Sequence, residues 1–136
     1  MKIDAIIRKC KWMTQTRLKT FAKENYDKVY AYLKETVPEK SATTLCLGTI
    51  WTCCSLDKGF SKGEWELVSY LVPQFSYEQA YHSANDFYQT TAPDIVRGLI
   101  HRMPEDVGEA LASVCVAVLI SDKKLDGKEM EFLRSL

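Results

Sequence analysis

The chain is poor in the residues that build catalytic and phosphate-binding motifs. It contains two histidines and six glycines among 136 residues. Neither histidine lies in an HExxH motif, and no GxSxG motif supplies a nucleophile. No glycine-rich loop follows a predicted strand, so no phosphate cradle is indicated. We therefore predict a protein that is not an enzyme.

The signatures of disulfide frameworks, zinc sites and membrane spans are also missing. The five cysteines are odd in number and show no Cys-x-x-Cys spacing, which argues against a disulfide framework and a zinc knuckle. Structural thiols are the favoured interpretation, and a redox role for adjacent Cys53 and Cys54 is the alternative. No apolar run approaches the roughly 20 residues of a transmembrane helix, and no signal-peptide core is present. We expect a soluble, cytoplasmic protein.

A net charge of zero, from 18 basic and 18 acidic residues, does not indicate a polyanion binder. The charges are nevertheless unevenly distributed. Residues 1–40 hold ten Lys or Arg against five acids, whereas residues 41–136 hold eight against thirteen. Arg8, Lys9 and Lys11 would lie on the outer face of the first helix. This basic face is an alternative contact surface for an anionic membrane or a nucleic acid.

Apolar residues recur with helical spacing throughout, and no convincing run alternates with the period of a strand. The pattern predicts a single all-α domain over residues 1–136, a bundle of seven to eight helices. The predicted helices cover residues 3–13, 16–37, 41–56, 61–73, 77–90, a short stretch between Pro93 and Pro104, 104–120 and 126–136. Ser41 is predicted to cap the third helix. The helices over 41–56 and 104–120 are apolar nearly all round, so we expect them to be central and buried.

Residues 56–71 and 121–136 match at an offset of 65 residues and predict an internal duplication. Each segment follows an apolar helix and carries an acid, a large apolar residue and a capped helix start. The corresponding residues are Asp57, Phe60, Ser61 and Glu64 in the first segment, and Asp122, Leu125, Asp126 and Glu129 in the second. Ser61 and Glu64 form a predicted capping box. Both loops lack the acid that an EF-hand needs at its last position.

This doubled arrangement resembles the TerB-like (tellurite-resistance B-like) helical domain family over residues 41–136. The resemblance implies an internally duplicated helical bundle without catalytic activity, associated with stress responses and membrane-linked assemblies. It also implies acidic clusters that bind a divalent metal. The residues of this chain that would take that role are Asp57, Glu64, Asp122, Asp126 and Glu129.

The chain departs from the family pattern at these loops and at its N-terminus. Lys58 and Lys123 stand where the family has glycine, and neighbouring ammonium groups oppose cation binding. We therefore favour solvated helix caps over a metal site and expect no cofactor, with a divalent metal as the alternative. The first 40 residues carry no family motif. The first segment is followed by the predicted helix over 77–90, whereas the second segment has no such helix after it in this sequence. We expect the helices of the first 40 residues to occupy the corresponding place in the fold.

The predicted helix over residues 77–90 carries an aromatic stripe. Packing at the core or its rim is one interpretation, and a partner groove or dimer face is the other, because tyrosine is enriched at interfaces. We predict a non-catalytic module that binds another protein, with a homodimer as an alternative, and favour this over membrane or nucleic-acid contact. The candidate interaction residues are Arg8, Lys9, Lys11, Tyr77, Tyr81 and Tyr88.

Overall fold

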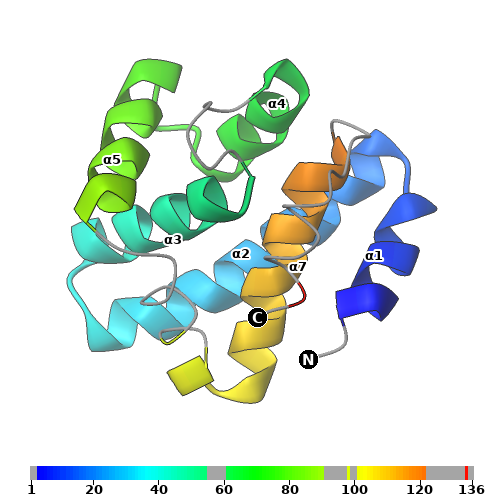
Figure 1. Cartoon of the computed structure of the whole chain (residues 1–136), viewed down its shortest axis with the longest axis horizontal. Coiled ribbons are helices and arrows are strands. Elements are labelled where there is room, and N and C mark those ends of the chain that lie inside the picture. Colours follow the sequence, from blue (N-terminus) through cyan, green and yellow to red (C-terminus); the bar gives the residue numbers. More distant parts are fainter. Residues whose placement is uncertain (1–2, 55–60, 91–97, 99–100, 122–133, 135–136) are drawn as a thin grey trace.

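The computed structural model describes residues 3–54, 61–90, 98, 101–121 and 134, and most of these residues are helical. The helices are α1 (Ile3–Lys11), α2 (Gln15–Thr36), α3 (Glu39–Cys54), α4 (Lys62–Leu71), α5 (Tyr77–Thr90) and α7 (Glu105–Ser121) (Figure 1). No strand occurs in these ranges, and the predicted all-α class is confirmed. The helix predicted over 126–136 and most of the one between Pro93 and Pro104 lie outside the described residues.

The central helix is α7. Every residue from Ala110 to Leu119 is buried, as its apolar sequence predicts. It packs against α1, α2, α3 and α4, and α2 is its most extensive neighbour. Figure 1 shows α7 lying over α2, with α3 to one side and α1 to the other. The other apolar helix, α3, is also buried from Cys46 to Ile50, so the expectation holds for its described side chains.

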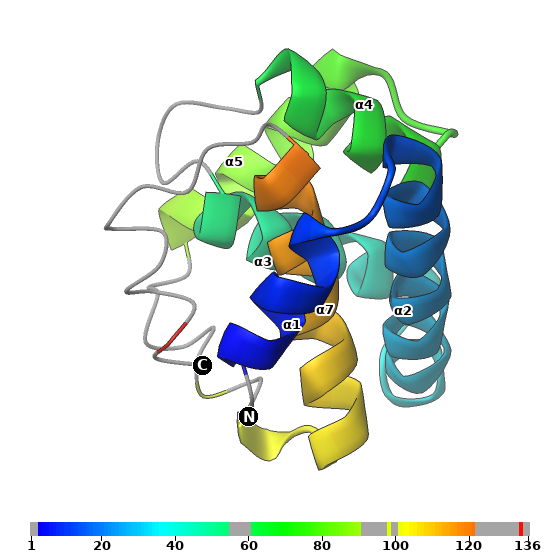
Figure 2. The same ribbon diagram turned by 90° about the vertical axis from the view of Figure 1, so that its right-hand side faces the viewer.

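The two N-terminal helices belong to the same hydrophobic core as α7. Each helix buries one apolar face in this core, and Figure 2 shows both helices against α7. The buried residues are Ile3, Ile6, Ile7 and Cys10 on α1, and Leu18, Ala22, Tyr26, Val29 and Leu33 on α2. The basic residues of this segment therefore lie on the outside of helices whose inner faces are anchored.

The start of α3 differs from the sequence prediction. The helix begins at Glu39, and the amide of Ala42 donates to the carbonyl oxygen of Pro38 at 3.0 Å. The prediction that Ser41 is the N-cap is therefore wrong. Pro38 has no amide hydrogen and a fixed φ, so it can precede the first turn without leaving a donor unsatisfied.

The predicted duplication falls largely beyond the described part of the chain. The first segment contributes α4, whereas the second is described only at Ser121 and Arg134. The Ser121 hydroxyl lies 2.5 Å from the Val118 carbonyl oxygen, its shorter hydrogen bond, and 3.2 Å from the Gly63 carbonyl oxygen, so the end of α7 lies close to the first turn of α4. Equivalence of the two segments stays a prediction.

Candidate functional site: an aromatic row on α4 and α5

Four rings follow one another along the surface of α4 and α5. The Trp65 and Tyr77 centroids lie 5.2 Å apart, edge to face. Tyr77 stacks on Tyr81 at 6.4 Å, and Tyr81 meets His82 edge to face at 5.6 Å. Tyr77 and Tyr81 are 39% and 36% exposed, while Trp65 is half-buried against the core. We call these four residues the aromatic row.

Two capping boxes fix the helix starts that position these rings. At α4, the Ser61 amide donates to Glu64 Oε1 at 2.8 Å and the Glu64 amide donates to Ser61 Oγ at 3.2 Å. This confirms the predicted box. At α5, Ser76 and Gln79 make the same reciprocal pair at 2.9 and 3.2 Å. Each box satisfies amides that the first helical turn leaves without partners, so both starts are well defined.

Helical spacing then decides which side chains face outward. Tyr77 and Tyr81 are four residues apart and lie on one face of α5. Ala80, between them, is fully buried and turns toward the core. The aromatic rings therefore lie at the rim rather than in the core, with Trp65 of α4 closing the row on one side.

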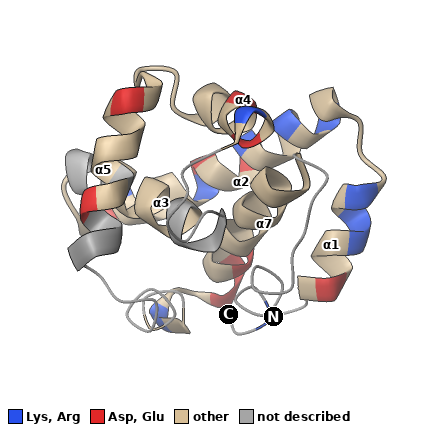
Figure 3. Cartoon of the chain, turned by 45° about the horizontal axis from the view of Figure 1, so that its top comes forward, with Lys and Arg blue, Asp and Glu red and all other residues tan. Residues whose placement is uncertain are grey.

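The surroundings of the aromatic row are acidic. The charged residues exposed on α4 and α5 are Lys62, Glu66, Glu78 and Asp86. Glu66 follows Trp65 in the chain and Glu78 follows Tyr77, and Figure 3 shows the acids along α5. The faces of aromatic rings attract cations through their quadrupole. Rings and carboxylates together favour a positively charged ligand.

The predicted interaction residues divide into two separate groups. Tyr77 and Tyr81 lie in the aromatic row, whereas Arg8, Lys9 and Lys11 are exposed on α1. Figures 1 and 3 place α1 and α5 at opposite ends of the molecule. The backbone of Tyr88 belongs to α5, and its side chain lies outside the described part. The structure therefore does not join these residues into one site.

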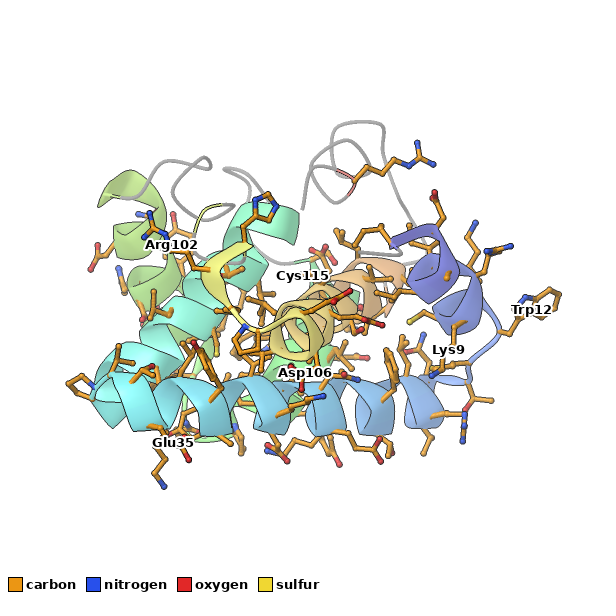
Figure 4. The ribbon with its side chains drawn as sticks, turned by 90° about the horizontal axis from the view of Figure 1, so that it is seen from below. Lys9, Trp12, Glu35, Arg102, Asp106 and Cys115 are labelled. Atoms are coloured by element: carbon orange, nitrogen blue, oxygen red, sulfur yellow. The ribbon has the colours of Figure 1, made fainter. Side chains whose placement is uncertain are left out.

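A pocket of about 360 Å³ lies between α1, α2 and α7. On its wall, the Lys9 ammonium sits 5.1 Å from the centre of the Phe21 ring, and Lys28 pairs with Asp106 at 3.2 Å. The hydrogen bond from Lys28 lowers the pKa of the Asp106 carboxyl below its usual value. Figure 4 shows Lys9 and Asp106 both lying over α2. These polar groups engage one another and the ring, so the pocket does not single out a ligand.

Of the candidate metal ligands, only Glu64 is described. It is buried, and one of its carboxylate oxygens caps α4. Asp57, Asp122, Asp126 and Glu129 lie outside the described residues. Where side chains are described, no group of three His, Cys, Asp or Glu residues is placed to hold a metal ion. The metal site stays a prediction.

The described cysteines have the environment of structural thiols. Cys10, Cys46 and Cys115 are buried and reduced. Burial raises the pKa of the Cys10 thiol to about 11 and that of Cys46 to about 12, which suppresses the reactive thiolate. The side chains of Cys53 and Cys54 are not among those described, so the redox alternative for this pair is untested.

No family model, curated protein or solved structure matches this chain. The TerB-like resemblance therefore remains an expectation from the motif. In the described ranges, no helix combines the length and apolar character needed to cross a bilayer. The function has to be argued from the surface itself.

Proposed function

We propose that this protein is a non-catalytic helical interaction module that binds another protein through the aromatic row. The observation that carries the proposal is the unbroken series of ring contacts from Trp65 to His82, whose two middle members are exposed tyrosines. Tyrosine and tryptophan offer large, rigid contact areas at a low cost in side-chain entropy and dominate interface hot spots. The TerB-like resemblance of residues 41–136 favours the same non-catalytic class and a role in a stress response.

The acidic surroundings support a partner with a basic surface. Glu66, Glu78 and Asp86 are exposed on the same two helices as the aromatic row. A partner with Arg or Lys side chains would gain cation–π contacts and complementary charge. A symmetric homodimer through the same surface would instead bring these carboxylates close to their own copies. We therefore favour a protein with a basic docking surface over a second copy.

Affinity capture with matched variants tests this proposal. The wild type, a Tyr77→Ala/Tyr81→Ala double variant and a Tyr70→Ala control are immobilised and exposed to lysate of the source cells. Tyr70 is 47% exposed on α4 but makes no ring contact with the row, so its removal controls for loss of any surface aromatic. We expect a protein retained by the wild type and the control but lost from the double variant. Identical captures by all three would contradict the proposal.

A further inference from the structure

Trp12 extends into solvent from the turn between α1 and α2. It is 90% exposed, and the next most exposed large apolar side chain among those described, Tyr70, is 47% exposed. Figure 4 shows the indole pointing away from the body at one edge of the molecule. Tryptophan usually buries most of its large surface, so this degree of exposure sets Trp12 apart.

The backbone on either side of Trp12 is firmly held. The Met13 amide donates to the Cys10 carbonyl at 3.1 Å and closes α1, and Thr14 Oγ1 accepts from the Arg17 amide at 3.2 Å and caps α2. Cys10 is buried, and Met13 packs against the core. The exposed indole is therefore presented by a defined turn between two anchored helices.

Positive charge surrounds this turn. Between Asp4 and Glu24 the sequence contains six Lys or Arg and no acid. Arg8, Lys11 and Arg17 are exposed close to Trp12 in the chain, and Figure 3 shows basic residues on α1 and at the start of α2. Asp4, at the far end of α1, is paired with Arg134 at 3.2 Å. We call Arg8, Lys11, Trp12 and Arg17 the Trp12 corner.

We propose that the Trp12 corner docks the protein on an anionic lipid surface. The indole is suited to the boundary between headgroups and acyl chains, where tryptophan is enriched. The cations beside it would be drawn to the negative surface potential of acidic lipids. An isolated ring that protrudes among cations can penetrate a soft, anionic layer without needing a shaped pocket.

The structure also defines how this docking would occur. A basic amphipathic helix binds a bilayer by burying its apolar face in the interface. The apolar face of α1 is instead packed in the core, with Ile3, Ile6 and Ile7 each at most 7% exposed. Contact is therefore limited to the corner, and α1 need not leave the fold.

Other polyanions and protein partners fit this surface less well. Proteins that bind single-stranded nucleic acid present several stacking rings along a basic groove, whereas one exposed ring marks the corner. Protein hot spots lie among apolar neighbours that exclude water. The residues exposed around Trp12 are charged or polar, so a lipid surface is the better match.

Vesicle flotation with purified full-length protein tests the docking proposal. Phosphatidylcholine vesicles with and without phosphatidylserine are compared at low and physiological salt. We expect binding only to the anionic vesicles, and weaker binding as salt screens the attraction. Trp12→Ala should lower partitioning by about tenfold, and each of Lys11→Glu and Arg17→Glu by about fivefold or more.

Matched control variants distinguish vesicle binding through the Trp12 corner from an effect of net charge alone. They also distinguish it from protein binding through the aromatic row. Lys34→Glu and Lys62→Glu change the net charge equally but lie outside the corner, so they should retain most of the binding. Tyr70→Ala removes an exposed aromatic elsewhere and should bind like the wild type. The Tyr77→Ala/Tyr81→Ala variant should also float normally, because docking does not depend on the aromatic row.

Three results would overturn the docking proposal. These are no binding to anionic vesicles at low salt, equal binding to neutral vesicles, and wild-type partitioning of Trp12→Ala. A parallel titration with fluorescent single-stranded and duplex DNA tests whether the Trp12 corner binds nucleic acid instead of lipid. Tight DNA binding that is lost in Trp12→Ala, without vesicle binding, would assign the corner to nucleic acid instead.

Discussion

At the scale of single residues, a few side chains with defined partners position the aromatic row. Ser61 and Ser76 each exchange two hydrogen bonds with a residue three positions later, and these bonds determine where α4 and α5 begin. Trp65 and Tyr77 lie close to the two starts and meet at 5.2 Å. The row therefore depends on local capping as well as on packing.

Replacement of Ser61 by alanine tests the capping contribution. Ser61→Ala removes the acceptor for the Glu64 amide, and loss of such a cap costs about 1 kcal/mol of unfolding free energy. Urea denaturation measures the change. Ser69→Ala is the control, because the Ser69 hydroxyl donates only to a carbonyl within the same helix, and we expect it to be nearly neutral. Equal losses for both variants would argue against the capping role.

The buried thiols predict a pH dependence of stability. An ordinary thiol ionises near pH 9.0, whereas Cys10 and Cys46 ionise near 11 and 12 in the folded state. Burial also raises the pKa of the Tyr26 phenol, so it acts in the same direction. Below pH 9.0 the thiols stay protonated in both states. Above it only the unfolded chain loses protons, so the free energy of unfolding falls as pH rises toward the folded values.

Thermal unfolding followed from neutral to alkaline pH measures this effect. We expect the wild-type Tm to decline above about pH 9. Cys46→Ala should have a lower Tm at neutral pH because it loses packing, but a shallower decline in alkali because one thiol no longer titrates. Parallel curves for the two proteins would contradict this account.

Sequence patterns predicted some of the candidate site residues and missed others. Tyr77 and Tyr81 followed from helical spacing, because residues four apart share a face. The contact with Trp65 joins two helices, and periodicity within one helix does not reveal its neighbour. Ser76 and Gln79 had the spacing of a capping box that we did not identify. The exposure of Trp12 was also missed, since the adjacent Cys10 and Met13 turn inward at the helix end.

At the scale of whole elements, the spacing of apolar residues predicted where the helices lie more accurately than where they begin and end. The spacing predicted α5 over its observed range and α2 to within one residue at either end. At α3, the polar Ser41 suggested a cap, but Pro38 makes an earlier start possible. Cap preferences are weak compared with the packing of an apolar helix, and packing decides where such a helix begins.

The two acidic sequence segments, around Glu64 and around Glu129, carry the untested metal hypothesis. Calorimetric titration with calcium, magnesium and zinc, repeated on Glu64→Ala and Glu129→Ala, examines it directly. Because Glu64 already accepts a capping hydrogen bond and lysines stand next to these acids in both sequence segments, we expect little heat from any of these ions. Saturable heat in the wild type that disappears in both variants would instead establish acidic metal ligands.

At the scale of the molecule, one core joins the basic N-terminal helices to the acidic remainder. Residues from Ile3 to Leu119 contribute to a single hydrophobic cluster. Among the described residues, α1 exposes Arg8, Lys9 and Lys11 and α5 exposes Glu78 and Asp86, whereas α7 carries exposed acids beside α2. Figure 3 places α1 and α5 at opposite ends of the molecule. Trp12 directly follows α1, and Tyr77 and Tyr81 belong to α5, so a protein partner and a lipid surface would not compete for the same residues.

Removal of residues 1–37 tests whether the N-terminal helices are part of the fold. The deletion removes α1 and α2, which pack against α7. Apolar residues of α7 that are buried in the intact chain would then be exposed to solvent. We expect the remainder to lose cooperative unfolding, as measured by circular dichroism during heating. The point variant Trp12→Ala is the control for the same segment and should unfold like the wild type. A stable, cooperative truncated protein would show that residues 38–136 fold independently.

The central claim is that Tyr77 and Tyr81 of the aromatic row bind a basic protein surface and are not required for the chain to fold. Calorimetric titration of the captured partner, once purified, into the wild type and the Tyr77→Ala/Tyr81→Ala variant tests this claim most directly. We predict a loss of affinity of about tenfold or more per tyrosine, as expected for interface hot spots, with a modestly lower Tm from the lost ring contacts but cooperative unfolding retained. Equal affinities for the two proteins would contradict the claim.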